Sequence, residues 1–247
     1  MPDIDLSVTP LRELNAALHQ LTPETNERHW VIEHPAGGHA IAAGLNVPVT
    51  VEINGSVGYY CAGMNKLATV LVHGSAGVGV AENMMSGFVH VSGDASQAAG
   101  ARGAGGLLRI DGNASSRCGI SMKGIDIVVQ GSVGHMSAFM AQSGNLVVFG
   151  DAGDSLGDSI YEARLFVRGS VKASAPIASR RRCATSIRLP CTTCSLVGAS
   201  TARSILASSS DTGRPARSTL STSITQESID GRDAEDDATQ VCDVRRL

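Results

Sequence analysis

The chain has 247 residues, of which 3% are aromatic and 17% are charged, while 28 are glycine, and its formal net charge is −3 at pH 7. An ordinary globular domain has roughly 25% charged residues. Because aromatic residues are so few, the interior must be filled by Val, Ile, Leu and Ala. The slight excess of acidic residues argues against nucleic-acid binding. No apolar run approaches the roughly 18 residues of a membrane span, and no secretion signal is visible. Six cysteines are too sparse for a disulfide scaffold. We therefore expect a cytoplasmic protein that does not bind membranes.

The first part of the chain contains one predicted helix. Thr9 followed by Pro10 is typical of a helix start, with Thr9 as the N-cap and the proline in the first helical position. Four leucines then follow at helical spacing. We therefore predict a short amphipathic helix over residues 10–21, with its apolar stripe formed by Leu11, Leu14, Leu18 and Leu21.

Two short strands are expected after this helix. Residues 30–32 and 40–42 have strand-like composition, and residues 35–38 between them contain proline and two glycines, which are typical of a turn. We interpret residues 1–48 as a small α/β cap, because the end of a sheet-based solenoid exposes unpaired strand edges. A helix that binds a partner protein is the alternative.

The middle of the chain is an internal repeat with a period of 19 residues. A β-branched residue stands two positions before each repeated glycine, and another aliphatic residue stands four positions before it. Two positions after each glycine the side chain is Val or Ala, whereas the position directly before it is mostly polar. The glycines that define the repeat are Gly55, Gly74, Gly93, Gly112, Gly131, Gly150 and Gly169.

This alternation of apolar and polar residues is typical of a strand with one buried face. Since the strand recurs at a fixed spacing, each copy is expected to pair in parallel and in register with the next. We therefore predict an all-β fold, a single-stranded, right-handed parallel β-helix with 19-residue turns over residues 49–172. The seven glycines are interpreted as structural turn residues, placed where a Cβ would clash.

A few apolar residues fall on the outward positions of the predicted strands. Elsewhere these positions are mostly polar, so the apolar ones are candidates for a surface that docks a partner. Scattered exposed hydrophobic residues are common, however, and form the alternative interpretation. The positions are Leu71, Val128, Val147 and Phe149.

The composition changes abruptly after Lys172. Residues 173–247 contain no Phe, Tyr, Trp or Lys, are rich in Ser, Thr and Arg, and show no periodicity, so one interpretation is a disordered tail. Back-translation with GC-rich codons and reading in a shifted frame restores aromatic, acidic and lysine residues together. We therefore expect that this segment is a frameshifted translation without an evolved function, and that the CxxC spacing of Cys191 and Cys194 and the arginines at 180–182 carry no site.

The glycine columns resemble a known family. They are similar to the GXGXG β-helix domain at the C-terminus of the glutamate synthase large subunit, a module that is also similar to one of the subunits of formylmethanofuran dehydrogenase. The likeness is carried by residues 74–79, 131–134 and 150–153. Closest is the stand-alone version, the β-helix subunit of N-methylglutamate synthase (methylamine–glutamate N-methyltransferase), to which three stretches are similar: 5–19, 53–60 and 144–172.

The resemblance covers about residues 1–172 and implies a division of labour. A glutamine-amidotransferase-like subunit and a large subunit with FMN and an iron–sulfur cluster would carry the chemistry. The β-helix would hold them together as a scaffold, with no catalytic, cofactor-binding or metal-binding residue of its own. An assembly role in another redox complex, similar to formylmethanofuran dehydrogenase, is the alternative.

The glycines and histidines of the repeat are candidates for sites. Gly74, Gly77 and Gly79 have the spacing of a nucleotide loop, but such a loop must open a helix after a strand, and equivalent glycines here recur in every turn. A metal site needs several ligands at set geometry, and the histidines form no short-spaced pair. His73 and His90 lie in different columns, and the isolated ones are His34, His39 and His135.

The cysteines and acidic residues give no stronger signal. Cys61 and Cys118 are three repeats apart, which places them about 14 Å from each other by strand spacing, beyond the reach of a disulfide. Asp151, Asp154 and Asp158 lack the order of a calcium loop and are interpreted as turn residues. An independent β-helix enzyme acting on polysaccharide is a further alternative, but it would need acidic side chains stacked in one column, and Glu52, Asp111 and Asp126 fall at different phases.

Overall fold

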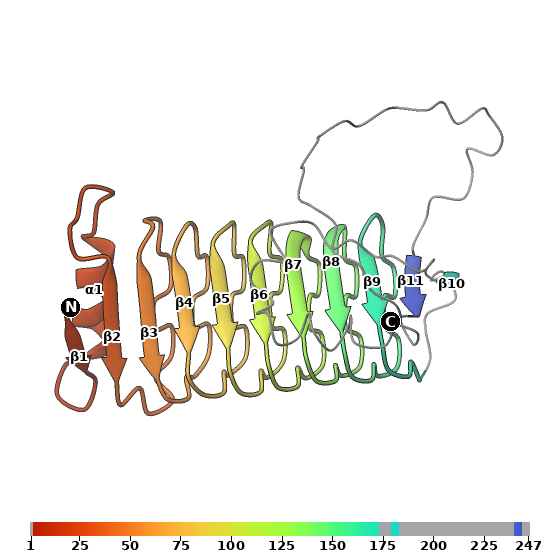
Figure 1. The fold of residues 1–247 in the computed structure, drawn as a ribbon, viewed down its shortest axis with the longest axis horizontal. Helices are drawn as coiled ribbons and strands as arrows, with labels where there is room; N and C mark the ends of the chain where they lie inside the picture. Colours follow the sequence, from red (N-terminus) through yellow and green to blue (C-terminus); the bar gives the residue numbers. More distant parts are fainter. Residues whose placement is uncertain (1, 173–178, 183–239, 244–247) are drawn as a thin grey trace, which may run out of the picture. The chain divides into compact units, whose positions relative to one another are not determined.

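The computed structural model describes residues 2–172, 179–182 and 240–243. Within these ranges the strands form one sheet in which β1 to β9 follow one another in chain order and are followed by β11 and then β10. Figure 1 shows β1 to β9 side by side; from β3 to β9 each strand is joined to the next by a coil of similar path, whereas α1 lies between β1 and β2 in the chain. The elements are β1 (Asp3–Asp5), α1 (Leu11–His19), β2 (His29–Glu33), β3 (Thr50–Asn54), β4 (Thr69–Val72), β5 (Phe88–Val91), β6 (Leu107–Ile110), β7 (Lys123–Val129), β8 (Ser143–Val148), β9 (Arg164–Val167), β10 (Ser179–Arg182) and β11 (Gln240–Asp243).

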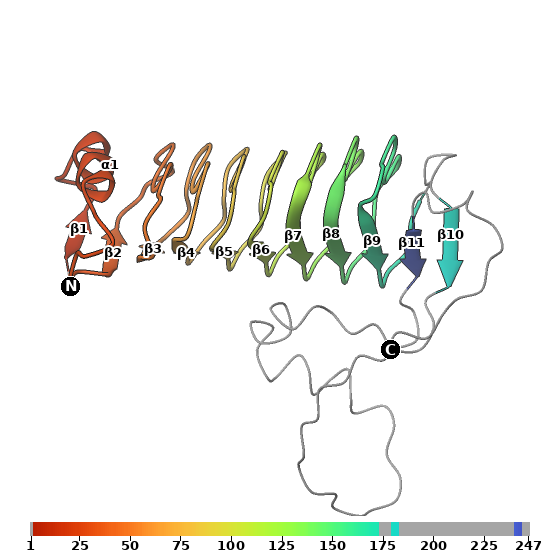
Figure 2. The same cartoon turned by 90° about the horizontal axis from the view of Figure 1, so that it is seen from above.

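Strands β3 to β9 pair in parallel at an offset of 19 residues. Ile53 is the Cα partner of Val72, and Val72 is the partner of Val91. The same register persists to the pairing of Val148 with Val167, apart from an irregularity at the start of β7, where Lys123 pairs with Ser143. Because successive side chains of a strand point to opposite faces, this register stacks each buried aliphatic residue on its copy in the next coil. The predicted all-β parallel solenoid is confirmed, and Figure 2 shows how closely its coils repeat.

A second line of contacts joins the coils two residues beyond the glycine column. Val57 bridges Ala76, and the equivalent bridges continue to Val171. The space between the two lines is filled by aliphatic side chains such as those of Val51 and Ile53, both fully buried. Columns of Val, Ile, Leu and Ala fill so narrow an interior, which explains the low aromatic content of the chain.

The N-terminal segment departs from the predictions in two details. Helix α1 spans Leu11–His19 and buries Leu14 and Leu18, but its N-cap is Pro10 and not Thr9. The amide of Thr9 donates to the carbonyl of Asp5 at 2.8 Å, which holds Thr9 in the preceding turn, so the helix begins one residue later. Its last residue is His19, two residues before the predicted end.

The strand expected at residues 40–42 is wrong. Ala40 and Ala42 have φ values of 57° and 54° and lie in a turn. These residues are apolar because the corner, like a strand, buries side chains: Ile41 and Ala42 are both fully buried. The strand expected at 30–32 is confirmed as β2, which pairs with β3 at an offset of 21 residues, so the ladder already begins within the segment expected to form the cap.

Two short strands lie in the segment for which no regular structure was expected. Strand β11 pairs in parallel with β9, and β10 pairs with β11. The edge of a sheet offers unpaired backbone N–H and C=O groups to any extended segment, so pairing there does not require a particular side-chain pattern. The CxxC pair Cys191 and Cys194 lies outside the described residues.

Candidate functional site

Neighbouring coils approach closely along the glycine column. The amide of Gly93 donates to the carbonyl of Gly74 at 2.9 Å, and this bond recurs in each later coil as far as Gly169. A Cβ added at Gly74 would lie 2.6 Å from the carbonyl carbon of Gly55. Of the seven glycines only Gly55 has a positive φ, of 142°. Close contact between coils, and not a left-handed backbone, therefore requires glycine in this column.

The residue after each of these glycines forms a polar ladder that was not predicted from the sequence. The amide of Asn113 donates to Asp94 Oδ1 at 2.7 Å, and the amide of Ser132 donates to Asn113 Oδ1 at 2.9 Å. The signal in the sequence was the restriction of this column to Ser, Asp and Asn, whose short side chains bond readily to nearby backbone. The members are Ser56, Ser75, Asp94, Asn113, Ser132, Asp151 and Ser170.

Removing one rung of the polar ladder should cost a moderate amount of stability. We expect Asn113→Ala to lower the free energy of unfolding by about 1 kcal/mol, because the amide of Ser132 loses its side-chain acceptor but remains accessible to water. Urea titration would measure the change. The exposed Gln97 has no place in the ladder, so Gln97→Ala is the matched control, and an equal loss from both substitutions would contradict this role of the ladder.

The corners of the coils follow a simple rule of hydrogen bonding. The amide of Ala81 donates back to the carbonyl of Cys61 in the preceding coil at 2.9 Å. The amide of Met64 donates forward to the carbonyl of Glu82 in the following coil at 2.7 Å. Each corner therefore needs a neighbour on both sides, and the first coil has no coil before it.

Helix α1 supplies the missing groups through two side chains. Asn15 Oδ1 accepts from the amide of Ala42 at 3.1 Å, and Asn15 Nδ2 donates to the carbonyl of Ala40 at 2.9 Å. His19 Nε2 lies 2.7 Å from the carbonyl of Ala43. A carbonyl only accepts, so this nitrogen carries the hydrogen. We call Asn15 and His19 the first-coil cap, because their side chains replace the peptide groups of a preceding coil.

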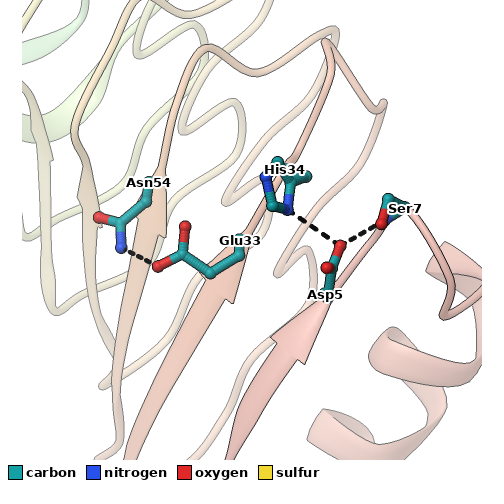
Figure 3. A network of polar contacts seen from close by, with 5 residues as sticks. All are labelled: Asp5, Ser7, Glu33, His34 and Asn54. Carbon is teal, nitrogen blue, oxygen red and sulfur yellow. Dashed lines mark hydrogen bonds and ion pairs between the residues drawn. The ribbon is translucent and has the colours of Figure 1, made fainter.

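Polar side chains of the first strands form a small network on the surface. Figure 3 shows Asp5 between Ser7 and His34, with His34 Nδ1 3.1 Å from Asp5 Oδ1 and the amide of Ser7 donating to the same oxygen at 2.7 Å. Hydrogen bonds from Ser7, with a smaller contribution from His34, lower the pKa of Asp5. Nearby, Asn54 Nδ2 donates to Glu33 Oε1. The bond from Ser7 is local to the turn after β1, whereas the contacts of His34 and Asn54 connect neighbouring strands and so add to the support between coils.

Charged residues in the middle of the sheet pair on its outer face. Asp111 receives bonds from Arg109 Nε at 2.7 Å and from His90 Nε2 at 2.8 Å. Burial alone would raise the pKa of Asp111, but the bonds from Arg109 and His90 outweigh it and the pKa is lowered. The acidic residue Glu52 instead lies 3.8 Å from His73 Nε2. His73 and His90 therefore belong to different pairs and do not form a common site.

The remaining predicted candidates are also separated. Nδ1 of His39 accepts from the amide of Tyr59 at 3.0 Å, and the two rings stack with centroids 4.6 Å apart. Asp151 belongs to the polar ladder, whereas the side chain of Asp158 accepts from Ser159 Oγ. Among the described residues no group of three or more His, Cys, Asp or Glu side chains could hold a metal ion.

The glycines at 74–79 do not form a phosphate loop. Gly77 lies against the backbone of Gly58, with 2.6 Å between an added Cβ and the carbonyl carbon, and Gly79 is a corner residue with φ of 73°. No helix follows them in the described part of the chain. Their spacing reflects contact between coils, as the repetition in the sequence predicted.

Comparison with known proteins places the chain in a family. Protein GlxC of Rhizobium meliloti (strain 1021) is 68% identical over 173 residues, which is 70% of this chain and 76% of the relative. The chain belongs to the GlxC family. The relationship supports a glutamate-synthase-like family for this GlxC-family protein. No protein-family model and no solved structure matches the chain.

Two of the four predicted docking residues lie beside one another on the outer face of the sheet, whereas Leu71 lies apart from them on β4. Val128 and Val147 are Cα partners on β7 and β8, and Val147 in turn pairs with Phe166. Val128 is 2% exposed, whereas Leu71 and Phe149 are partly exposed. Docking of a partner on these residues stays a prediction. No helix of the described residues is long and apolar enough to span a bilayer.

The two cysteines of the GlxC-family core should be chemically inert. Cys61 and Cys118 are fully buried, and burial raises the pKa of each thiol to about 12. Since the thiolate is the reactive form, we expect neither to be alkylated by iodoacetamide near neutral pH in the folded protein. Peptide mass spectrometry would measure labelling before and after denaturation, and equal labelling of Cys61 in both states would contradict its burial.

Proposed function

We propose that this GlxC-family chain is the non-catalytic scaffold subunit of a glutamate-synthase-like flavoenzyme complex, N-methylglutamate synthase, which uses methylamine and glutamate. The observation that carries the proposal is how the described coils use their side chains. Aliphatic residues fill the interior, and the polar ladder and the first-coil cap direct their polar groups to neighbouring coils instead of toward one point. Such a molecule is suited to holding other proteins at a fixed spacing.

The partners in this proposal are a glutamine-amidotransferase-like subunit and a large subunit that carries FMN and an iron–sulfur cluster. The relationship to Protein GlxC and the GXGXG repeat support a place in the glutamate-synthase-like group. Reduced thiols deep in the core agree with a cytoplasmic location. An assembly role in a formylmethanofuran-dehydrogenase-like complex is the alternative.

Co-expression with the two proposed partner subunits tests this function. The chain purified alone should show no flavin absorbance and no turnover, whereas the three-subunit complex should contain FMN and form N-methylglutamate from methylamine and glutamate. Flavin in the isolated chain, or full activity of the two partner subunits without it, would overturn the scaffold role. Association with formylmethanofuran dehydrogenase subunits in their place would favour the alternative.

We also propose that residues 173–247 are the product of a frameshift. The comparison with Protein GlxC aligns 173 of the 247 residues and leaves 74 residues of the chain unmatched. The segment before residue 173 has nearly the aligned length. Resequencing the gene decides the matter. A shifted frame that continues the match into the remaining 24% of the relative supports the proposal, and an intact frame shared by close relatives overturns it.

A further inference from the structure

Each coil turns through a corner in which every second residue is left-handed. In one coil Tyr60, Ala62 and Met64 have φ values of 59°, 52° and 57°. The middle residue, Ala62, is fully buried, whereas the two outer ones are about half exposed. We name the outer positions of six successive coils the αL edge: Tyr60, Met64, Gly79, Asn83, Ala98, Arg102, Arg117, Ser121, Met136, Met140, Ser155 and Ser159.

The αL edge holds side chains that its backbone does not favour. A left-handed conformation costs a non-glycine residue roughly 1–2 kcal/mol, least for Asn and Asp, and bulky residues rarely adopt it. Gly79 and Asn83 occupy the edge in one coil and satisfy this preference. The coil before it instead has Tyr60 and Met64 at the same two positions. Part of the Tyr60 ring packs over Gly79 of the next coil, yet about half of Tyr60 and of Met64 stays exposed, so packing within the fold accounts for only part of these two side chains.

The large side chains are sorted by chemistry along the solenoid. Tyr60 and Met64 are 51% and 54% exposed, and Met140, four coils further on, is 52% exposed. Exposed basic residues stand in the coils between them, Arg102 and Arg117 on the edge and Lys123 just after it. None of these three forms an ion pair with a described residue.

We propose that the αL edge binds a protein segment whose acidic side chains lie between two apolar ones. The centre of the partner segment is expected to be acidic, because Arg102, Arg117 and Lys123 are exposed and form no ion pair within the described part of the chain. Apolar contacts at either end would be about 19 Å apart, four strand spacings, a span of about three to four turns of helix. Tyr and Met are enriched at protein interfaces, which fits both ends of the edge.

This inference rests on the proposed scaffold role and deepens it by naming the surface on which a partner would dock. It can be tested without the partner, with a random copolymer of glutamate and tyrosine as the probe. Fluorescence anisotropy should show binding that weakens at high salt, because the cations are exposed. The triple variant Arg102→Glu, Arg117→Glu, Lys123→Glu should bind at least about tenfold more weakly.

The matched control reverses three exposed basic residues away from the edge: Arg12→Glu, Arg164→Glu and Arg168→Glu. It changes the net charge equally and should retain binding. A second variant, Tyr60→Gly with Met64→Asn, uses the residues of the next coil. It should weaken binding without lowering the melting temperature. No binding of the copolymer by the unmodified chain, or equal loss in both triple variants, would overturn the inference.

Co-purification with the proposed partner subunits separates the two proposals. If the unmodified chain forms the complex and the edge variant with reversed charges does not, both stand. If the complex and copolymer binding survive that variant, the edge inference fails and the scaffold role remains. If no complex forms but the copolymer binds through the edge, the scaffold role fails and the docking surface stands.

Discussion

Substitution of Gly74 by alanine is expected to lower the free energy of unfolding by about 3 kcal/mol or more. The added methyl group would lie 2.6 Å from the carbonyl carbon of Gly55 and 2.7 Å from the amide nitrogen of Ser56. Both atoms are backbone and belong to a coil bonded in register on its other side, so neither can move away cheaply. Urea unfolding followed by circular dichroism would measure the loss.

Gly37→Ala is the control for this substitution. No atom lies within 4 Å of a Cβ at Gly37, although its φ is 71°. Only the cost of a left-handed alanine is expected there, about 1 kcal/mol. If Gly74→Ala were tolerated as well as Gly37→Ala, the coils could separate at the glycine column, and the explanation by close contact would be wrong.

Loss of the first-coil cap is also expected to lower the stability substantially. Asn15→Ala leaves the amide of Ala42 without its acceptor, and it leaves the carbonyl of Ala40 with only the 3.4 Å bond from the amide of Ala43. A partly buried group left unsatisfied costs about 1–3 kcal/mol, so we expect a loss of about 2 kcal/mol. Adding His19→Ala should increase the loss, since the carbonyl of Ala43 then also lacks its donor.

Hydrogen exchange would locate this effect as well as measure it. Protection should fall first in the coil that contains β2 and β3, because each coil is stabilised mainly by its neighbours. Arg12→Ala, an exposed change on the same helix, is the control. Uniform loss of protection along the sheet, or equal effects of Asn15→Ala and Arg12→Ala, would show that α1 does not cap the first coil.

The repeat made the fold predictable because the same pattern of apolar residues and glycine recurs in every coil. A β-branched column and a glycine column in constant register admit only parallel stacking, and the pairing of Ile53 with Val72 follows directly. The corner at residues 40–42 was predicted wrongly because a run of apolar residues fits a buried corner, with left-handed residues at every second position, as well as it fits a strand.

The candidate surfaces were harder to predict than the fold. The polar ladder was visible in the sequence as a column of Ser, Asp and Asn. Its hydrogen bonds run from the backbone amide of one residue to the side chain 19 residues earlier, and composition does not reveal such bonds. The αL edge depends on φ values that residues such as Tyr60 and Arg117 give no reason to expect. Membership in the GlxC family rests on comparison and not on any of these features.

The coil length, the buried columns and the parallel register could all be read from the amino-acid pattern, since a periodic arrangement of apolar residues and glycines has one efficient way to bury its apolar side chains. The hydrogen-bond partners of the backbone at the ends and corners became visible only in three dimensions. The side chain of Asn15 bonds the first coil as a preceding coil would, and Met64 is an exposed residue with a left-handed backbone. Both roles depend on contacts with the neighbouring coil. Contacts of that kind join residues distant in the sequence, where local pattern carries no information.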